Sequence, residues 1–463
     1  MEIDTVITNG SVFLGGTFTP LDVAIADGCI AALGSTGAFH GARTILDARG
    51  LLVLPGAIDS HFHVRGPAHP ERETFASATR AAAAGGVTTI IEMPIAIPPA
   101  TNGDTLRERM AAADREIYVD IGFYASAGTL QTDDLASSID AGALAFKAFL
   151  QHIPPGREDE FSGLCLATNG ELLEAFQLLR EFPYPCAFHA EDESMLQQLE
   201  VQLKRAHRAD GLAHAESRPD YVEATSVGTL LRLAEHFGVH VHIPHVSSKM
   251  TAALIREAKA RGVHVTAETC PHYLQFDSGA LVRLGPYAKC NPPLKSPQDI
   301  EAVWDAVRDG TIDTLASDHA PFTHEEKERA RDDIWVAPPG FPGVEVLVPF
   351  AVGAALEDNL SLSRLNMLLY ENPARIFGLW PRKGTLRPGA DADVVLYDPT
   401  AVGVFDCRTF RSQAGTTGTI WDGTRRIGLV STTIVRGMIV YMEDAIVGES
   451  GTGMVLTRAG GER

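Results

Sequence analysis

Residues 51–63, LLVLPGAIDSHFH, decide the fold and the chemistry that we expect of this chain. The apolar run at 51–58 is typical of a buried strand. Side chains two residues apart in an extended chain point the same way, so His61 and His63 share one face. Two imidazoles at a strand end can supply half of a site for a first-row transition metal. The alternative is a pair of structural histidines, and the other strand ends decide between the two interpretations.

Eight apolar segments of strand type alternate with stretches of helical pattern. The strand segments are 51–58, 87–93, 117–124, 143–150, 184–189, 239–245, 263–268 and 312–317. The helical stretches include 74–86, 169–182, 224–238, 250–262 and 297–310. Several of them end in Gly, a common helix stop. Eight strands that alternate with helices predict an α/β fold of the (β/α)₈ TIM-barrel type.

Both ends of the chain carry a different pattern. Short strand-like segments broken by Gly, Asn and Asp occupy residues 1–50 and return after about residue 380. Such segments are typical of β-hairpins. We therefore expect residues 1–50 and 381–463 to form one small β-sandwich domain, and residues 51–380 to form the catalytic barrel domain.

Composition excludes several classes of partner. The 463 residues are 45% hydrophobic, which is enough for a large core, and carry a formal net charge of -20. Such a charge repels phosphate backbones and anionic membranes, so we expect neither nucleic acid nor membrane as a partner. The six cysteines are scattered without a Cys-x-x-Cys pair, and no signal-peptide pattern or apolar run of transmembrane length is present. These features predict a cytoplasmic protein without a disulfide framework.

Further residues of ligand type follow other expected strands. Lys147 lies in the fourth segment, His189 and His245 end the fifth and sixth, and Asp318 follows the eighth. Active sites of this barrel lie at the carboxyl ends of its strands, where side chains from different strands converge. Together with the two histidines of the first strand, this ring suits two divalent metal ions that share ligands.

Lys147 and Asp318 each have an alternative role. A free ammonium at Lys147 would be costly to bury, so it could reach solvent or pair with a carboxylate. Its amine could instead have reacted with CO₂, giving a carbamate whose two oxygens bridge the metals. Asp318 could cap the helix that follows it, although its position after a buried run favours a role as a base.

The histidines of the later strands also have alternatives. His189 could be a core histidine, although the acidic residues after it mark a polar strand end. His245 competes with His240 and His242 for the ligand role. An offset of three residues reverses a side chain in a strand, so His242 lies on the face opposite His245.

With these motifs the chain resembles the amidohydrolase superfamily, in its cyclic-amide branch of hydantoinases and dihydropyrimidinases, allantoinases and dihydroorotases. The likeness spans nearly the whole chain. It rests on PGAIDSHFHVR (55–65), GGVTTIIEMP (85–94), GALAFKAFL (142–150), HAEDE (189–193), HVSS (245–248), ETCPHYL (268–274), KCNPPLKS (289–296), IDTLASDHAP (312–321), PPGFPGVE (338–345), NPARIFGL (372–379) and KGTLRPGADADVVLYDP (383–399).

The resemblance implies a role for each ligand and two divalent metal ions, expected to be Zn²⁺. In that pattern the more buried metal is bound by His61 and His63, the more exposed one by His189 and His245, and carbamylated Lys147 bridges them. A hydroxide between the metals would attack a ring carbonyl. Asp318 would be a ligand and would carry the proton of that hydroxide to the departing ring nitrogen.

The substrate-binding residues are less uniform. Arg65 completes His-x-His-x-Arg, which resembles the carboxylate clamp of dihydroorotases, although it could instead form a structural salt bridge. Asn291 also fits a dihydroorotase. Ile95 and Phe322, however, stand where that enzyme would have Asn and His. The segment 92–101, EMPIAIPPAT, is similar to that of allantoinases and some hydantoinases, while the Tyr that D-type hydantoinases carry past the bridging lysine is absent.

From this pattern we expect a hydrolase of carbon–nitrogen bonds in cyclic amides. Its expected substrate is a small cyclic ureide, as for a hydantoinase or allantoinase, and dihydroorotase is the second candidate. An inactive dihydropyrimidinase-like scaffold is a further alternative, but all six ligand positions are filled. The resemblance also implies a homo-oligomer, a dimer or tetramer.

Overall fold

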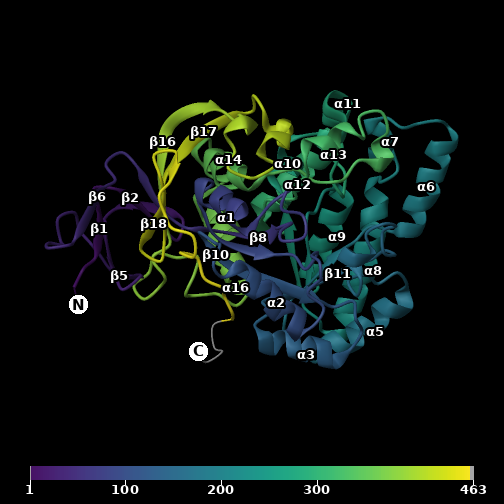
Figure 1. Ribbon diagram of the computed structural model, residues 1–463, viewed down its shortest axis with the longest axis horizontal. Coiled ribbons are helices and arrows are strands. Elements are labelled where there is room, and N and C mark those ends of the chain that lie inside the picture. Colours follow the sequence, from purple (N-terminus) through teal and green to yellow (C-terminus); the bar gives the residue numbers. More distant parts are fainter. Residues whose placement is uncertain (1, 459–463) are drawn as a thin grey trace.

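The computed structural model describes residues 2–458, and its centre is an eight-stranded parallel sheet rolled into a barrel (Figure 1). The strands are β8 (Ala57–Phe62), β9 (Val87–Glu92), β10 (Asp120–Ser126), β11 (Ala145–Phe149), β12 (Cys186–His189), β13 (Val241–Ile243), β14 (Val265–Thr269) and β15 (Thr314–Leu315). Each strand pairs in parallel with the next. A parallel bridge between Phe62 and His319 brings the first strand to the segment after the last. The predicted (β/α)₈ barrel is confirmed.

The barrel strands are apolar because they are covered on both faces. Every residue of β8, β9, β10, β11 and β12 is buried. Strands of a parallel sheet that lie between helices and a packed interior therefore read as continuous hydrophobic runs. This explains why the strands could be located from the sequence by apolar runs alone.

A helix follows each barrel strand and lies in the outer layer. The main helices are α1 (Phe75–Ala84), α2 (Gly103–Ala113), α3 (Thr132–Ala141), α5 (Asn169–Leu179), α8 (Asp220–Phe237), α9 (Lys249–Ala260), α12 (Pro297–Asp309) and α14 (Val344–Leu356). At the start of α1, α5 and α12, a Thr or Ser side chain accepts a backbone N–H. Gly142, Gly238 and Gly310 end α3, α8 and α12 with positive φ, which glycine adopts without strain.

The remaining α-helices occupy the connections. They are α4 (Glu158–Phe161), α6 (Glu193–Arg205), α7 (Gly211–Glu216), α10 (Pro271–Gln275), α11 (Gly279–Leu284), α13 (His324–Glu328), α15 (Leu362–Asn366) and α16 (Asn372–Ile376). Among the described residues no helix is long and apolar enough to cross a membrane.

Two further sheets lie beside the barrel and are built from the two parts of the chain that flank it (Figure 1). The first has the order β5 (Cys29–Gly34), β4 (Asp22–Ala26), β1 (Thr5–Thr8), β6 (Thr44–Asp47). The second has the order β19 (Ala445–Ile446), β18 (Met438–Met442), β17 (Arg425–Val435), β16 (Val394–Val404), β7 (Leu52–Pro55), β2 (Ser11–Leu14), β3 (Thr17–Pro20). Ile7, Val23, Val53, Val394 and Ile434 from both sheets share one core, as expected for a β-sandwich.

The apolar run at 51–58 is divided between the two parts of the fold. We expected one barrel strand, but Leu52–Pro55 is β7 in the second terminal sheet, and only from Ala57 does the chain enter the barrel. The change occurs at Gly56, where a Cβ would collide with Thr88 of the neighbouring strand. Both sheets are buried there, so hydropathy alone does not mark the change. The domain boundaries near residues 50 and 380 stay a prediction.

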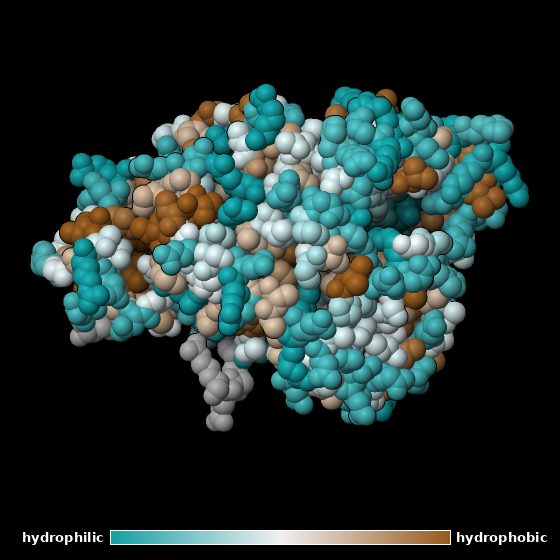
Figure 2. Space-filling view, viewed as in Figure 1, coloured by the Kyte–Doolittle hydropathy of each residue, from teal (hydrophilic) through white to brown (hydrophobic). Residues whose placement is uncertain are grey.

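The surface is mainly hydrophilic on the face in Figure 2. Its largest apolar area lies over the terminal sheets, at the left of the view. Exposed hydrophobic side chains of this part of the chain include Met438 and Val447, which are 46% and 51% exposed.

Candidate active site

The six predicted metal ligands lie at or near the carboxyl ends of five barrel strands. They are His61 in β8 and His63 just after it, Lys147 in β11, His189 at the end of β12, His245 two residues after β13, and Asp318 three residues after β15. The five histidine and lysine side chains are buried, and that of Asp318 is 12% exposed. The barrel therefore gathers at one mouth six side chains that are far apart in sequence.

The first group joins His61, His63 and Asp318. The Nε2 atoms of both histidines lie 3.4 Å from Oδ1 of Asp318. Ligand atoms of the three residues all lie within 4.8 Å of one another. Four ligands at Zn–N distances of about 2.0 Å in a tetrahedron would lie roughly 3.3 Å apart. The observed distances therefore fit two imidazoles and a carboxylate that bind one cation.

The second group joins His189 and His245. Nδ1 of His189 lies 3.1 Å from Nε2 of His245, again close to the edge of a tetrahedral zinc site. The ring of His245 lies 5.3 Å from that of His61, measured between centroids, so the two groups are adjacent. Two neighbouring donor sets of nitrogen and oxygen suit a pair of divalent ions.

Lys147 is buried beside both groups. Lys147 is 1% exposed, and its Nζ has no hydrogen-bond partner among the described residues. Burial lowers the pKa of Lys147 to about 8, although Asp318 and Glu268 oppose the shift. Its charge in turn contributes to the lowered pKa values of His189 and His245, after the larger effect of their burial. An unpaired amine in this position is unfavourable unless it is neutral or modified.

Two ligands stand on strained backbone. His245 and Asp318 have φ values of 41° and 47°, in the left-handed region that residues other than glycine rarely adopt. Such conformations concentrate at functional sites, where the surrounding structure holds them. Here each of the two strained residues follows a barrel strand, Asp318 beside the imidazoles of the first group and His245 beside His189.

Glu268, at the end of β14, orients His61. Its Oε1 lies 2.8 Å from Nδ1 of His61, and its Oε2 accepts a hydrogen bond from the Ser60 hydroxyl. Burial would raise the pKa of Glu268, but the adjacent imidazoles of His242 and His61 hold it below its usual value. With Nδ1–H directed at this carboxylate, Nε2 of His61 presents its lone pair to the metal position. No role was predicted for Glu268, although it begins the ETCPHYL motif.

Two further carboxylates hold neighbouring ligands. Oε2 of Glu191 lies 3.1 Å from Nε2 of His189 and accepts a hydrogen bond from Arg218. Asp59 accepts hydrogen bonds from the backbone N–H and hydroxyl of Ser317, the residue before Asp318. Neither role was predicted. Glu191 could have been suspected because it follows His189 by two residues in an acidic motif.

No hydrogen bond joins Arg65 and Asn291, the predicted substrate contacts, in the described part of the chain. Arg65 is 8% exposed, and its Nε has no hydrogen-bond partner among the described residues. It stacks 4.9 Å from the Phe322 ring and lines a small cavity with Ile95 and Glu160. Burial lowers the pKa of Arg65 to about 9. Oδ1 of Asn291 is also buried without a described partner.

Comparison with known proteins gives the family of the chain. The model of the Amidohydrolase family matches residues 52–440. The chain belongs to this family. Its relatives include an allantoinase of Rubrobacter xylanophilus (36% identical; 99% of each chain covered), an L-hydantoinase of Paenarthrobacter aurescens (33%; 98% of each) and a dihydroorotase of Methanosarcina mazei (32%; 99% of this chain, 98% of that one).

A solved structure gives the same result for the fold. The L-hydantoinase (dihydropyrimidinase) from Arthrobacter aurescens superposes with a TM-score of 0.93 at 32% identity, and the match covers 98% of this chain and 100% of the other. The chain is therefore an amidohydrolase of the cyclic-amide branch along its whole described length, and a hydrolase of carbon–nitrogen bonds in cyclic amides.

Two other features of this amidohydrolase are separate from the strand ends. Asp120, Asp391 and Asp393 form a second cluster of acidic groups, but Nζ of Lys383 lies among them at 2.5–2.9 Å. That cluster is therefore a buried ion-pair network.

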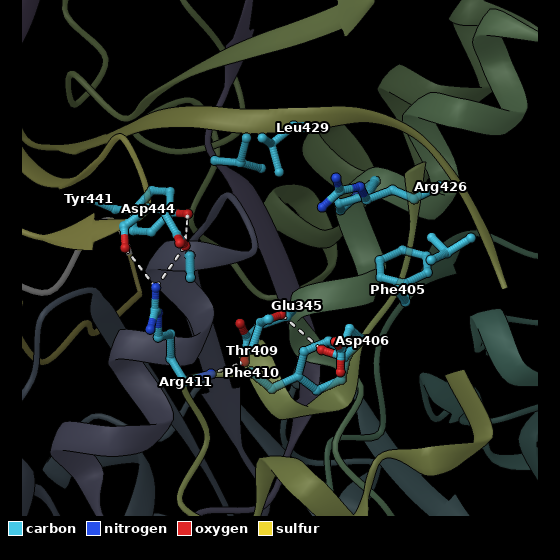
Figure 3. A pocket seen from close by; sticks show the side chains of 14 residues that line it. Glu345, Phe405, Asp406, Thr409, Phe410, Arg411, Arg426, Leu429, Tyr441 and Asp444 are labelled. Atoms are coloured by element: carbon cyan, nitrogen blue, oxygen red, sulfur yellow. Dashed lines mark hydrogen bonds and ion pairs between the residues drawn. The ribbon is translucent and has the colours of Figure 1, made fainter. Parts of the chain in front are cut away.

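A pocket lies between α14 and β17 (Figure 3). Its polar lining includes Glu345, Arg426 and the ion pair of Arg411 with Asp444. None of the six predicted ligands lines it, so it is distinct from the candidate active site.

Proposed function

We propose that this amidohydrolase opens the ring amide of a small cyclic ureide, as a hydantoinase or an allantoinase does. The observation that carries the proposal is the spacing of the donor atoms at the barrel mouth. Three pairs of ligand atoms lie 3.1–3.4 Å apart, which suits coordination of two cations. The relatives named hydantoinase and allantoinase support the choice of substrate class.

His61, His63 and Asp318 would hold one divalent cation, and His189 and His245 would hold the other, with Zn²⁺ as the expected metal. Bound there, the cations would polarise the ring carbonyl and make water a nucleophile at neutral pH. The nitrogen-rich donor set favours zinc over magnesium or calcium, which prefer oxygen ligands. Glu268 and Glu191 would keep two of the imidazoles in the ligating orientation.

We propose that Lys147 is carbamylated and joins the two groups. Support comes from its burial and from the lack of a hydrogen-bond partner for its Nζ among the described residues. Reaction of Nζ with CO₂ would replace an unpaired amine by an anionic group with two oxygens. One carbamate would then supply one oxygen to each side, a bridge that neither set of histidines provides.

Asp318 would move the proton during ring opening. Its carboxylate lies 3.4 Å from an imidazole nitrogen of each histidine of the first group. It would accept a proton from the attacking water and give it to the ring nitrogen as the carbon–nitrogen bond breaks. That transfer is needed because an amide anion is a poor leaving group.

Dihydroorotase is the second candidate, because Arg65 is a buried guanidinium whose Nε lacks a partner. A substrate carboxylate would satisfy it, and Asn291 would contact the ring from another side. Against this, Ile95 and Phe322 line the surroundings of Arg65 with apolar groups. These favour a ring without an acidic substituent, so the ureide stays first.

The test is ring opening by zinc-loaded protein on hydantoin, allantoin, dihydrouracil and dihydroorotate, with metal content measured on the same sample. Turnover of hydantoin or allantoin is the expected result. Turnover of dihydroorotate alone would make dihydroorotase the function. Absence of both bound metal and ring opening would favour an inactive scaffold.

We also infer a cytoplasmic homo-oligomer, a dimer or tetramer, without nucleic-acid partners. The six free cysteines of the structure and the net charge of -20 support the first and last points. The apolar area over the terminal sheets supports self-association (Figure 2). Sedimentation of the purified chain tests the oligomer.

A further inference from the structure

His272 is a buried imidazole that the metal ligands do not explain. It is the second residue of α10, which follows β14 after one residue, on the side of the barrel where the strands end. The side chain is 1% exposed, and neither ring nitrogen has a hydrogen-bond partner among the described residues. Buried polar groups are nearly always paired, so a ring with two unpaired nitrogens points to an absent ligand.

His272 follows the carboxyl end of β14, so it lies on the side of the barrel that carries the predicted ligands. Burial lowers the pKa of His272 to about 4, while Asp318 acts against that shift and His61 adds to it. A neutral imidazole offers one N–H donor and one lone-pair acceptor, on different nitrogens of the ring.

Two contacts fix the position of α10 between the neighbouring loops. The hydroxyl of Tyr273 donates a 2.6 Å hydrogen bond to the carbonyl of Pro292, the residue after Asn291. On the other side, the ring of Phe341 packs edge-on against His272 at 5.1 Å between centroids. The Phe341 carbonyl accepts a hydrogen bond from the backbone N–H of Ala320, two residues after Asp318. His272 thus lies between the segment that carries Asn291 and the segment that carries the proton carrier.

We propose that His272 binds the ureide edge of the substrate ring, on the side away from the amide bond that breaks. The inference rests on the proposed function and names the group that would select ureides. That edge presents an outer N–H, which the lone pair of one nitrogen of a neutral imidazole can accept. The unpaired Oδ1 of Asn291 would accept a hydrogen bond from the same ring.

A selectivity follows from this assignment. Succinimide has the same ring size as hydantoin and the same imide group, but a CH₂ replaces the outer N–H of the ureide. A site built around a polar contact discriminates strongly against a ligand that lacks the matching group. His272 would therefore make the protein prefer hydantoin over succinimide.

The experiment compares kcat/KM for hydantoin and succinimide in the zinc-loaded wild type, His272→Phe, His272→Leu and His272→Gln. His272→Phe keeps the ring packing on Phe341 and removes both nitrogens. We expect the hydantoin-to-succinimide ratio to fall about tenfold or more in the Phe and Leu variants, and the Gln variant to retain most of it. Metal content should stay at the wild-type level in all three.

His240→Gln is the matched control. This half-buried histidine forms a 3.0 Å hydrogen bond with the Thr266 hydroxyl. His240 lies just before β13, and so at the end of the barrel opposite the predicted ligands. It should leave the ratio unchanged. Dissociation constants of both compounds, measured by calorimetry in zinc-loaded Asp318→Asn protein with and without His272→Phe, should show the same change in ratio without turnover.

An unchanged ratio in whichever of His272→Phe and His272→Leu folds and holds metal would overturn the assignment of His272. Loss of metal in both folded variants would also overturn it, because the ring would then serve the ligands. If wild-type protein with two metals opens neither hydantoin nor any other cyclic ureide, the proposed function fails instead. The two failures are therefore distinct.

Discussion

Replacement of Glu268 should weaken metal binding without unfolding the protein. Glu268 is fully buried and lies 2.8 Å from Nδ1 of His61, so it sets which nitrogen of that ring faces the metal position. It also accepts a hydrogen bond from the Ser60 hydroxyl. Glu268→Gln keeps the shape and one acceptor oxygen but removes the negative charge. Glu268→Ala removes both acceptors and leaves the ring free to turn.

The magnitude follows from what each variant leaves unpaired. Carboxylates that orient metal-bound histidines are typically worth about 10–100-fold in metal affinity. Glu268→Gln retains a neutral hydrogen bond to His61, so we expect the lower end, about tenfold or ~1.4 kcal/mol. Glu268→Ala leaves two buried donors without an acceptor, so we expect about a hundredfold, or ~2.7 kcal/mol.

The assay is zinc titration of metal-free protein against a chromophoric chelator, with thermal melting of the metal-free forms as a check on folding. Glu345→Gln is the control, because Glu345 accepts backbone N–H groups of residues 411 and 412 and bonds none of the six ligands. Its zinc affinity should equal that of the wild type. Wild-type affinity in Glu268→Gln, or an equal loss in Glu345→Gln, would refute the role given to Glu268.

Four other predictions concern separate features. Lys147→Ala should lose metal and ring-opening activity together, since no carbamate can form; mass spectrometry that finds two metals per chain would count against the bridge. Arg65→Ala should reduce kcat/KM for dihydroorotate more than for hydantoin if its guanidinium binds a carboxylate; equal losses would indicate a structural role. Lys383→Met should lower the free energy of unfolding by about 3–5 kcal/mol, because it leaves Asp393 buried without an ion-pair partner and removes one of the two cations that pair with Asp120 and with Asp391. Urea denaturation measures this loss, and a loss below about 1 kcal/mol would contradict the burial argument. Burial raises the pKa of Glu345 to about 8 from its ordinary 4.5. Its contribution to stability is therefore complete below about pH 4.5 and is lost as the pH rises through about 8. Between these pH values the free energy of unfolding should fall less in Glu345→Gln than in the wild type, and an identical fall would exclude that titration.

The barrel could be predicted because its signals are local. Parallel strands buried on both faces appear as apolar runs, and the parity of a strand placed His61 and His63 on one face, where both meet Asp318. The same rule separated His242 from His245: His242 bonds Thr266, while His245 lies against His189.

What the sequence did not reveal depends on contacts between distant residues. Glu268 and His61 are 207 positions apart, and nothing in a single sequence pairs them. The boundary at Gly56 was missed because both sides of it are buried in apolar surroundings. His272 was missed because a single buried histidine is usually hydrogen-bonded, and its lack of partners is visible only in three dimensions.

The central claim is that two cations lie side by side at the barrel mouth. A crystal structure of zinc-loaded protein, with anomalous scattering recorded at the zinc edge, tests it most directly. We predict two anomalous peaks. One should lie within bonding distance of His61, His63 and Asp318, and the other within bonding distance of His189 and His245. Density for a carbamate on Lys147 should lie between the two peaks. A single peak, peaks elsewhere, or an unmodified Lys147 with no contact to either metal would contradict the account.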